Sequence, residues 1–442
     1  MLKTSIFGLV ACFALNGGQA LATDLLDVSI ATAGQYEIHY GVPFGSLQDS
    51  VPGVAHVLEH LKFAHGGPHS LDGLKAIQGS ATSASTTYRY TQYEVSVTAE
   101  HFAEAMQTLA QIAGPLPITA EELAREKQVV SQELIERQNA NPDGPFIEGF
   151  TRKLLESTPY AALPGGTLES VAQVTMDDVA RFNAAHYEHS NGFLTIAGPP
   201  LSSALQSAVI ANFPNTQRAM VSVDELRHAE VKDLGLGAAP VFLPPVAGFA
   251  MKPEKFRIDG TSSHVNSTRM IAAKLVSTDS TWKQRLAAVV VQEIINSRLP
   301  EGLTDMIAED AGLVQSFQVS IDGSLPHLLR LGLTANLAGG VGVEQVKAAY
   351  DAWLGKLMHD GISAKTFERV KARFLLHDEW DDAETRLRDL DMTSAEFGFA
   401  NAIAIRANLQ ELKLKDANDV LKLFTQDGRE GLAVLQPAGA NP

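Results

Sequence analysis

The chain has 442 residues, of which 45% are hydrophobic and 19% are charged. This length and composition are typical of a soluble globular protein with ample core, and two domains are the expectation at this size. The net charge of −16 argues against nucleic acid as the main partner, because phosphate contacts need a basic surface.

At the N-terminus, residues 1–22 have the pattern of a secretory signal peptide. Lys3 precedes a mostly apolar stretch at residues 6–15, and Ala20-Leu21-Ala22 has the small-x-small pattern of a cleavage site. The apolar stretch is too short to span a bilayer, and no later segment reaches the ~18 uninterrupted apolar residues of a transmembrane helix. The sequence therefore predicts an exported protein, periplasmic or secreted, with no transmembrane segment.

The single cysteine, Cys12, lies within this leader, so the mature chain would form no disulfides. Residues 9–12 also resemble a lipoprotein cleavage box, although the apolar stretch before them is unusually short. A lipid anchor at Cys12 is therefore the less favoured alternative to a freely soluble exported protein.

Residues 56–60, His-Val-Leu-Glu-His, follow a predicted strand at residues 36–40. Apolar residues before, within and after this pentapeptide have helical spacing, so the segment is predicted to be a helix. His56 and His60 then lie at positions i and i+4 on one face, close enough to bind one metal ion. Glu59 lies beside them and could hold a metal-bound water without being a ligand. H-x-x-E-H is the inverted order of a common zinc-protease motif.

A third metal ligand must come from another part of the chain, because a catalytic zinc has three protein ligands and one open position. Thr119 and Glu122 form a capping-box pattern that predicts the start of a long helix. On this helix Glu126 and Glu133 lie seven residues apart, which places them two turns along one face. Glu136 shares much of that face, so spacing alone leaves the choice open.

The second half of the sequence repeats features of the first. Residues 118–127 resemble residues 362–371, and both follow a predicted helix. Each half also closes on an apolar strand that runs into Gly and Pro. These matches predict two homologous domains, at residues 23–234 and 251–442, joined by a Gly-, Pro- and Ala-rich linker at residues 235–250.

Strand patterns mix with long helical ones, and clean βαβ alternation is missing, so the fold class is predicted to be α+β. Strands are expected at residues 36–40 and 90–98, and a long helix at residues 119–139. In the second half, residues 292–303 are expected to match the His56–His60 segment, and they contain no histidine. The metal ligands are therefore predicted in the first domain alone.

With these motifs in place, the chain resembles the pitrilysin/insulysin family of inverted-motif zinc peptidases, especially its short bacterial and mitochondrial-processing-type members. In that family a helix reading R-E-x-x-V-x-x-x-E follows H-x-x-E-H, and residues 125–133 match it. The resemblance implies zinc as the cofactor, Glu133 as the third ligand, and Glu126 as a supporting carboxylate that orients a histidine or the water. It also implies two pitrilysin-like domains.

A second family stretch, N-A-x-T-x-x-D-x-T-x-Y, appears here at residues 83–93. The Ala, both Thr and the Tyr agree, whereas the Asn is Ser83 and the Asp is Arg89. In relatives this region includes an edge strand that pairs with the substrate backbone. The resemblance therefore implies that Ser83, Ala84 and Ser85 bind substrate, and the two departures bear on substrate preference more than on catalysis.

One departure concerns an Arg and a Tyr, seven residues apart, that complete family members carry in the second half. Ala308 and Gln315 occupy those positions here. The chain thus resembles the metal-bearing member of a pair in which a homologous partner subunit supplies the Arg and the Tyr. A heterodimer is expected, with a homodimer as the other possibility.

The resemblance implies a metalloendopeptidase that cuts extended or unfolded peptides. Zinc would lower the pKa of its water, and Glu59 would accept the proton and pass it to the leaving amine. The alternative is a structural or peptide-holding subunit of a larger complex, weak or inactive by itself. Relatives of that kind typically lose some metal residues, whereas His56, Glu59, His60 and Glu133 are all present.

Overall fold

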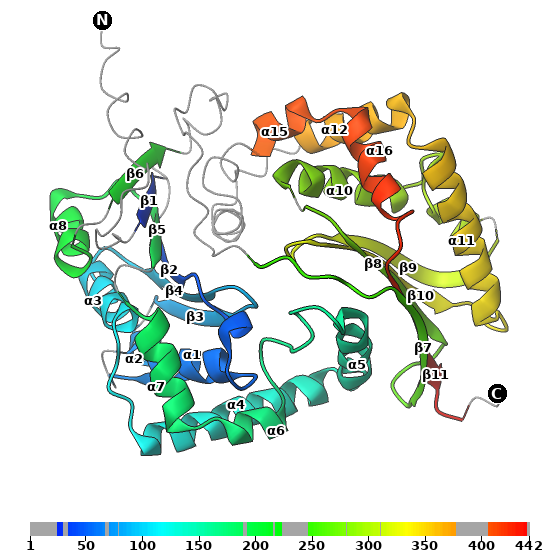
Figure 1. Ribbon diagram of the computed structural model, residues 1–442. Coiled ribbons are helices and arrows are strands. Elements are labelled where there is room, and N and C mark those ends of the chain that lie inside the picture. Colours follow the sequence, from blue (N-terminus) through cyan, green and yellow to red (C-terminus); the bar gives the residue numbers. More distant parts are fainter. Residues whose placement is uncertain are drawn as a thin grey trace, which may run out of the picture. The chain divides into compact units, whose positions relative to one another are not determined.

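The computed structural model describes residues 24–29, 34–66, 70–77, 79–188, 192–214, 217–222, 246–279, 281–309, 311–376 and 405–439. The predicted signal peptide, Cys12 and most of the predicted linker lie outside the described residues. Within the described ranges the chain forms two compact units, drawn in Figure 1. Unit 1 contains residues 24–136 and 162–222, and unit 2 contains residues 137–161, 246–376 and 406–439.

Unit 1 is built on a six-stranded sheet with the order β3-β4-β2-β5-β1-β6. Strand β1 pairs in parallel with β5 and β6, and the other neighbours are antiparallel. The predicted strands at residues 36–40 and 90–98 are confirmed as β2 and β4. The strands are β1 (Asp24–Ser29), β2 (Tyr36–Val42), β3 (Ala81–Thr86), β4 (Thr91–Val97), β5 (Phe193–Gly198) and β6 (Gln217–Ser222).

Helices pack on this sheet and close the core of unit 1. Helix α1 contacts β3 and β4, and helix α3 contacts β2 and β4. The core between them is apolar and includes Ile38, Val57, Leu58 and Val95, all fully buried. The helical elements are η1 (Ser46–Gln48), α1 (Val54–Ala64), α2 (Leu71–Leu74), α3 (Phe102–Ala113), α4 (Ala120–Ala140), α6 (Leu168–Gln173), α7 (Met176–His186) and α8 (Ser203–Asn212).

Unit 2 has a five-stranded sheet with the order β7-β11-β8-β10-β9. Its strands are β7 (Glu254–Ser262), β8 (Arg269–Ser277), β9 (Val314–Asp322), β10 (Leu328–Leu337) and β11 (Arg429–Pro437). Its helical elements are α5 (Gly144–Leu155), α10 (Trp282–Ile295), η3 (Asp305–Glu309), α11 (Val343–Asp360), α12 (Ala364–Leu376), α15 (Ile405–Glu411) and α16 (Leu414–Leu423). Together the two units confirm the predicted α+β class.

The two sheets share one topology. The order β7-β11-β8-β10-β9 in unit 2 matches β1-β5-β2-β4-β3 in unit 1, with the chain order of the strands preserved. The β7–β11 pair is parallel, as the β1–β5 pair is, and the other neighbours among these five matched strands are antiparallel in both sheets. This agreement supports the duplication predicted from the sequence repeat.

A pair of lysines makes the same contacts in both copies. Lys127 Nζ on α4 donates to the backbone carbonyls of Ala172 and Val174, at 2.7 and 2.8 Å. Lys371 Nζ, at the matching position of α12, donates to two carbonyls at the end of α15, also at 2.7 and 2.8 Å. Helix C-termini leave carbonyls without intrahelical partners, and each lysine satisfies such groups.

The equivalent of α1 in unit 2 is α10, because α10 follows β8 as α1 follows β2, and both pack on the edge strand of their sheet. Helix α10 begins at Trp282, earlier than the stretch at residues 292–303 that was expected to match. That register was wrong because a fixed offset between the halves ignores differences in loop length. The conclusion drawn from it holds, since α10 contains no histidine either. Among the described helices, none is both long and apolar enough to cross a bilayer.

Arg429, at the start of β11, anchors α5 within unit 2. Its side chain is 1% exposed and donates to the carbonyls of Lys153 (2.7 Å), Leu154 (2.8 Å) and Lys252 (3.2 Å). It also pairs with Glu254 at 2.8 Å. The cation therefore satisfies the C-terminal end of α5, where a positive charge is favourable.

Replacing Arg429 with Met should lower the free energy of unfolding of unit 2 by about 2–3 kcal/mol, because several buried carbonyls lose their donor. Tryptophan fluorescence during urea unfolding would measure this, since Trp282 and Trp353 both lie in unit 2. The control is Arg257→Met, which removes exposed ion pairs and should change stability by less than ~0.5 kcal/mol. Equal effects of the two variants would contradict this role for Arg429.

Candidate metal centre

Two residues that precede helix α1, Gly53 and Asp49, favour the start of the helix at Val54. Gly53, the N-cap residue, has φ +100°, in the left-handed region that favours glycine. The Asp49 carboxylate accepts the backbone N–H groups of Gly53 (2.7 Å) and Ala55 (2.8 Å). These are donors that the first turn of a helix leaves unpaired, and a carboxylate there is favourable. Burial raises the pKa of Asp49 to about 7, against the lowering effect of these N–H donors.

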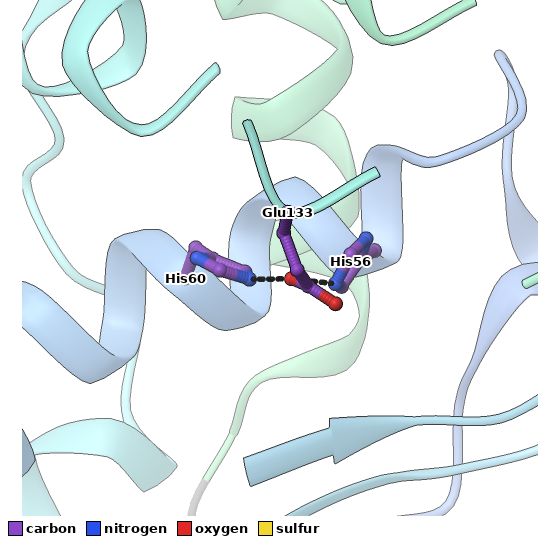
Figure 2. Close-up of side chains that lie close together, drawn as sticks. All are labelled: His56, His60 and Glu133. Carbon is purple, nitrogen blue, oxygen red and sulfur yellow. Dashed lines mark hydrogen bonds and ion pairs between the residues drawn. The ribbon is translucent and has the colours of Figure 1, made fainter. Parts of the chain in front are cut away.

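The sequence of α1 divides its side chains between the core and the candidate site. Val57, Leu58 and Leu61 are buried in the core of unit 1. The side chain of His56 is 9% exposed and that of His60 is 19% exposed. Figure 2 shows both imidazoles leaving α1 toward Glu133, which comes from α4. The predicted i and i+4 placement on one face is therefore present.

Helix α4 begins at the predicted capping box. The backbone N–H of Thr119 donates to Glu122 Oε2 at 2.8 Å, and the backbone N–H of Glu122 donates to Thr119 Oγ1 at 3.2 Å. Glu122 also contacts His65 Nδ1 at 3.0 Å, which links the start of α4 to the residue that follows α1. The two helices that carry the candidate ligands are thus connected at one end.

Three candidate ligands converge. One ligand atom from each of His56, His60 and Glu133 lies within 4.8 Å of the other two, the only such group of three or more among the described His, Cys, Asp and Glu residues. Glu133 Oε2 lies 3.2 Å from His60 Nε2 and 3.5 Å from His56 Nε2. The two imidazole rings meet edge to face, with centroids 4.9 Å apart.

These distances fit a zinc ion. Ligand atoms about 2.1 Å from a tetrahedral metal are separated from each other by about 3.4 Å. The Glu133–His distances lie on either side of that value, and two imidazoles with one carboxylate are a common zinc donor set. The Glu133 side chain is 36% exposed, so this side of the site is accessible to solvent.

Glu59 lies between the histidines in sequence but is not one of the three groups whose ligand atoms converge. It is 5% exposed, and its Oε2 accepts a hydrogen bond from Thr86 Oγ1 at 2.7 Å. Burial raises the pKa of Glu59, while His56 and the Thr86 hydroxyl act in the opposite direction. Burial would lower the pKa of His56, but the bond to Glu133 and the charge of Glu59 outweigh it and raise that pKa. A buried carboxylate beside imidazoles is suited to exchanging protons.

A buried lysine, Lys62, connects the last turn of α1 to the end of α3. Lys62 is fully buried, and its Nζ donates to the carbonyls of Ile112 (3.0 Å) and Gly114 (2.6 Å) at the end of α3. The same Nζ lies 4.0 Å from the centroid of the Tyr187 ring. Burial lowers the pKa of Lys62 to about 6. The Tyr187 hydroxyl in turn contacts the Tyr93 hydroxyl at 2.9 Å, which joins α1, α3 and β4 in one polar network.

Other predicted site residues lie elsewhere. Glu126 is 5% exposed on α4, and the contact of its carboxylate among the described residues is with Arg125 Nε at 2.9 Å. Within the described part of the chain, no hydrogen bond or ion pair joins Glu126 to His56, His60 or Glu133.

The predicted substrate-binding residues Ser83, Ala84 and Ser85 lie on β3, an edge strand of the unit 1 sheet. Ser83 and Ser85 are exposed and Ala84 is half-buried. In unit 2, Ala308 lies in η3 and Gln315 in β9.

Two residues around the centre were not predicted, Asp49 and Thr86. Asp49 lies four residues before the N-cap of α1, outside the usual capping positions, so local spacing carries no signal for it. Thr86 belongs to the family-like stretch at residues 83–93, but its contact with Glu59 joins residues 27 positions apart. That contact exists only through the packing of α1 on β3.

Residues 31–161 match the model of insulinase (peptidase family M16). The chain is 27% identical over 319 residues to coenzyme PQQ synthesis protein F of Pseudomonas aeruginosa, across 71% of this chain and 38% of that protein. It is 27% identical over 154 residues to zinc protease PqqE of Helicobacter pylori, across 33% of this chain and 34% of that protein. The chain thus spans little more than a third of the length of these two relatives.

Solved structures share the fold. A protease from Helicobacter pylori superposes with a TM-score of 0.73 at 18% identity, covering 95% of this chain and 98% of that one. A peptidase M16 inactive domain from Pseudomonas fluorescens gives 0.70 at 16% identity, covering 95% and 97%. The periplasmic protease PqqL from Escherichia coli gives 0.71 at 15% identity, covering 96% of this chain and 48% of that one.

Replacing Asp49 with Ala should destabilise the first turn of α1 by about 1 kcal/mol, because two N–H groups lose their acceptor. Hydrogen exchange followed by mass spectrometry would detect this as faster exchange in peptides that cover residues 54–60. Glu100→Ala, which removes an exposed carboxylate in the same unit, is the control and should leave that exchange unchanged. Unchanged exchange in Asp49→Ala would show that the cap is dispensable.

Proposed function

We propose that this chain, whose residues 31–161 belong to the insulinase (M16) family of peptidases, is a zinc-dependent endopeptidase. The resemblance to the pitrilysin/insulysin family predicted from the sequence is confirmed by that match. The observation that carries the proposal is the convergence of His56, His60 and Glu133 beside the buried carboxylate of Glu59. Relatives that are named zinc proteases support zinc as the metal.

The residues of the candidate metal centre would have two roles, metal binding and proton transfer. His56, His60 and Glu133 would hold the metal, which when bound supplies a Lewis acid and lowers the pKa of a bound water to ~7. Glu59 would accept a proton from the attacking water and deliver it to the amine that leaves. Because Glu59 is not a ligand, its carboxylate is free to change protonation without loss of the metal.

An extended peptide is the substrate that the site favours. Among the described strands β3 pairs with β4 alone, and residues 83–85 lie along it. A peptide could add to that edge by main-chain hydrogen bonds, which requires an extended and unfolded backbone. The exposed Ser83 and Ser85 side chains would then contact alternate substrate residues.

A homologous partner subunit is part of the proposal. Ala308 and Gln315 stand where complete relatives carry an Arg and a Tyr, so this chain lacks two groups that help bind substrate and stabilise the oxyanion. We infer that a homologous subunit supplies them, in a heterodimer or, failing that, in a homodimer. Residues 1–22 support export to the periplasm or beyond.

Replacing Glu133 with Gln should weaken zinc binding by about 10²-fold or more, because a neutral amide replaces a charged ligand. Competition against a chromophoric chelator, followed by metal analysis of the protein, would measure this. Glu136→Gln, one turn further along α4 and exposed, is the matched control and should retain zinc. Loss of zinc from Glu136→Gln with retention by Glu133→Gln would reverse the ligand assignment.

Replacing Glu59 with Gln should lower peptide turnover by about 10²- to 10⁴-fold at unchanged zinc content, because the proton acceptor is lost. The assay is cleavage of a quenched peptide library by the mature chain, alone and with a homologue that carries the Arg and the Tyr. Addition of that homologue should raise wild-type turnover by about 10²-fold. Zinc-loaded wild type without turnover that depends on Glu59, in either condition, would favour the peptide-holding alternative.

A further inference from the structure

Thr86 connects the edge strand β3, where we propose that substrate binds, to Glu59. It is the last residue of β3, the edge strand, and its Oγ1 donates to Glu59 Oε2 at 2.7 Å. Within the described residues this is the one hydrogen bond of the Glu59 carboxylate. One carboxylate oxygen is therefore fixed, and the other has no protein partner there and remains for proton transfer.

The neighbouring hydroxyl group of Thr91 is consistent with Thr86 being the donor and Glu59 the acceptor. Each threonine hydroxyl has one proton to donate. Thr91 Oγ1 lies 3.4 Å from Thr86 Oγ1 and 3.2 Å from the carbonyl oxygen of Phe44, to which it can donate. The Thr86 proton is then directed to the charged acceptor, Glu59, which gives the stronger bond.

The two faces of β3 have different surroundings, one packed against the protein and one exposed. Side chains alternate between faces, so Thr82, Ala84 and Thr86 lie on one face and Ser83 and Ser85 on the other. The first face is half-buried and contacts α1, whereas the second is exposed. Thr82 Oγ1 donates to the carbonyl of Leu71 at 3.1 Å, so that face is also bonded to α2. A change in the backbone of β3 would reach Glu59 through Thr86.

We propose that Thr86 is a positioning residue that orients Glu59 and couples that orientation to occupancy of the β3 edge by an extended peptide. This inference rests on the proposed peptidase function. A peptide that adds to β3 holds the backbone of the strand, and with it the Thr86 hydroxyl and the fixed oxygen of Glu59. The orientation contributes to the rate of proton transfer more than to peptide affinity.

The test compares three variants at matched zinc content. Thr86→Val keeps the shape and removes the hydroxyl, and Thr86→Ser restores it. Thr82→Val removes a hydroxyl bond from the same face of the same strand without touching Glu59. Thr86→Val should lower kcat by about 10-fold with KM changed less than about 2-fold, because Glu59 loses its orientation for proton transfer while the peptide-binding edge is kept. Thr86→Ser and Thr82→Val should stay within about 3-fold of wild type.

Crystal structures of zinc-loaded wild type and Thr86→Val give a readout that does not depend on activity. The Glu59 side chain should keep its place in wild type and turn to another rotamer in Thr86→Val. An unmoved Glu59, an equal loss of kcat in Thr82→Val, or loss of zinc from Thr86→Val would overturn the proposal. If wild type has no turnover that depends on Glu59, the peptidase function fails, and the crystal structures alone decide whether Thr86 positions Glu59.

Discussion

The placement of α1 against α4 is the constraint on which the rest of unit 1 depends. Two imidazoles on α1 and one carboxylate on α4 can share a metal only if their atoms stay about 3.4 Å apart. Contacts at both ends of α1 hold that geometry: Asp49 caps its start, and Lys62 ties its last turn to the end of α3. The bond between His65 and Glu122 then connects α1 to the start of α4.

Duplication of one fold accounts for the two similar sheets but not for the candidate metal site, which lies in unit 1. Both units use the same strand order, and Lys127 and Lys371 make the same pair of bonds in each. The equivalent of α1 in unit 2 carries no histidine, so its surface has no comparable donor set among the described residues. The fold thus tolerates loss of the ligands, because its stability comes from apolar packing and from pairs such as Arg429 with the end of α5.

The hydrogen bond between Thr86 and Glu59 links substrate binding and chemistry in our proposals. Glu59 is buried, yet its hydrogen bond to Thr86, the one it makes among the described residues, occupies one carboxylate oxygen and leaves the other for proton transfer. Because Thr86 ends an edge strand, the same element that would hold a peptide also holds the base. A buried carboxylate with few partners can change its protonation state at modest cost, which a fully bonded one cannot.

The sequence by itself determined the α+β class, the duplication and the candidate ligands His56 and His60, because helical periodicity and capping patterns are local. For Glu133, spacing left Glu126 and Glu136 as rivals, and the family-like stretch singled it out. Only the tertiary structure decided which of these carboxylates meets the imidazoles, since residues 73 positions apart are joined by packing alone. For the same reason the sequence did not predict Asp49 and Thr86, whose contacts with α1 depend on how a loop and a strand pack against that helix.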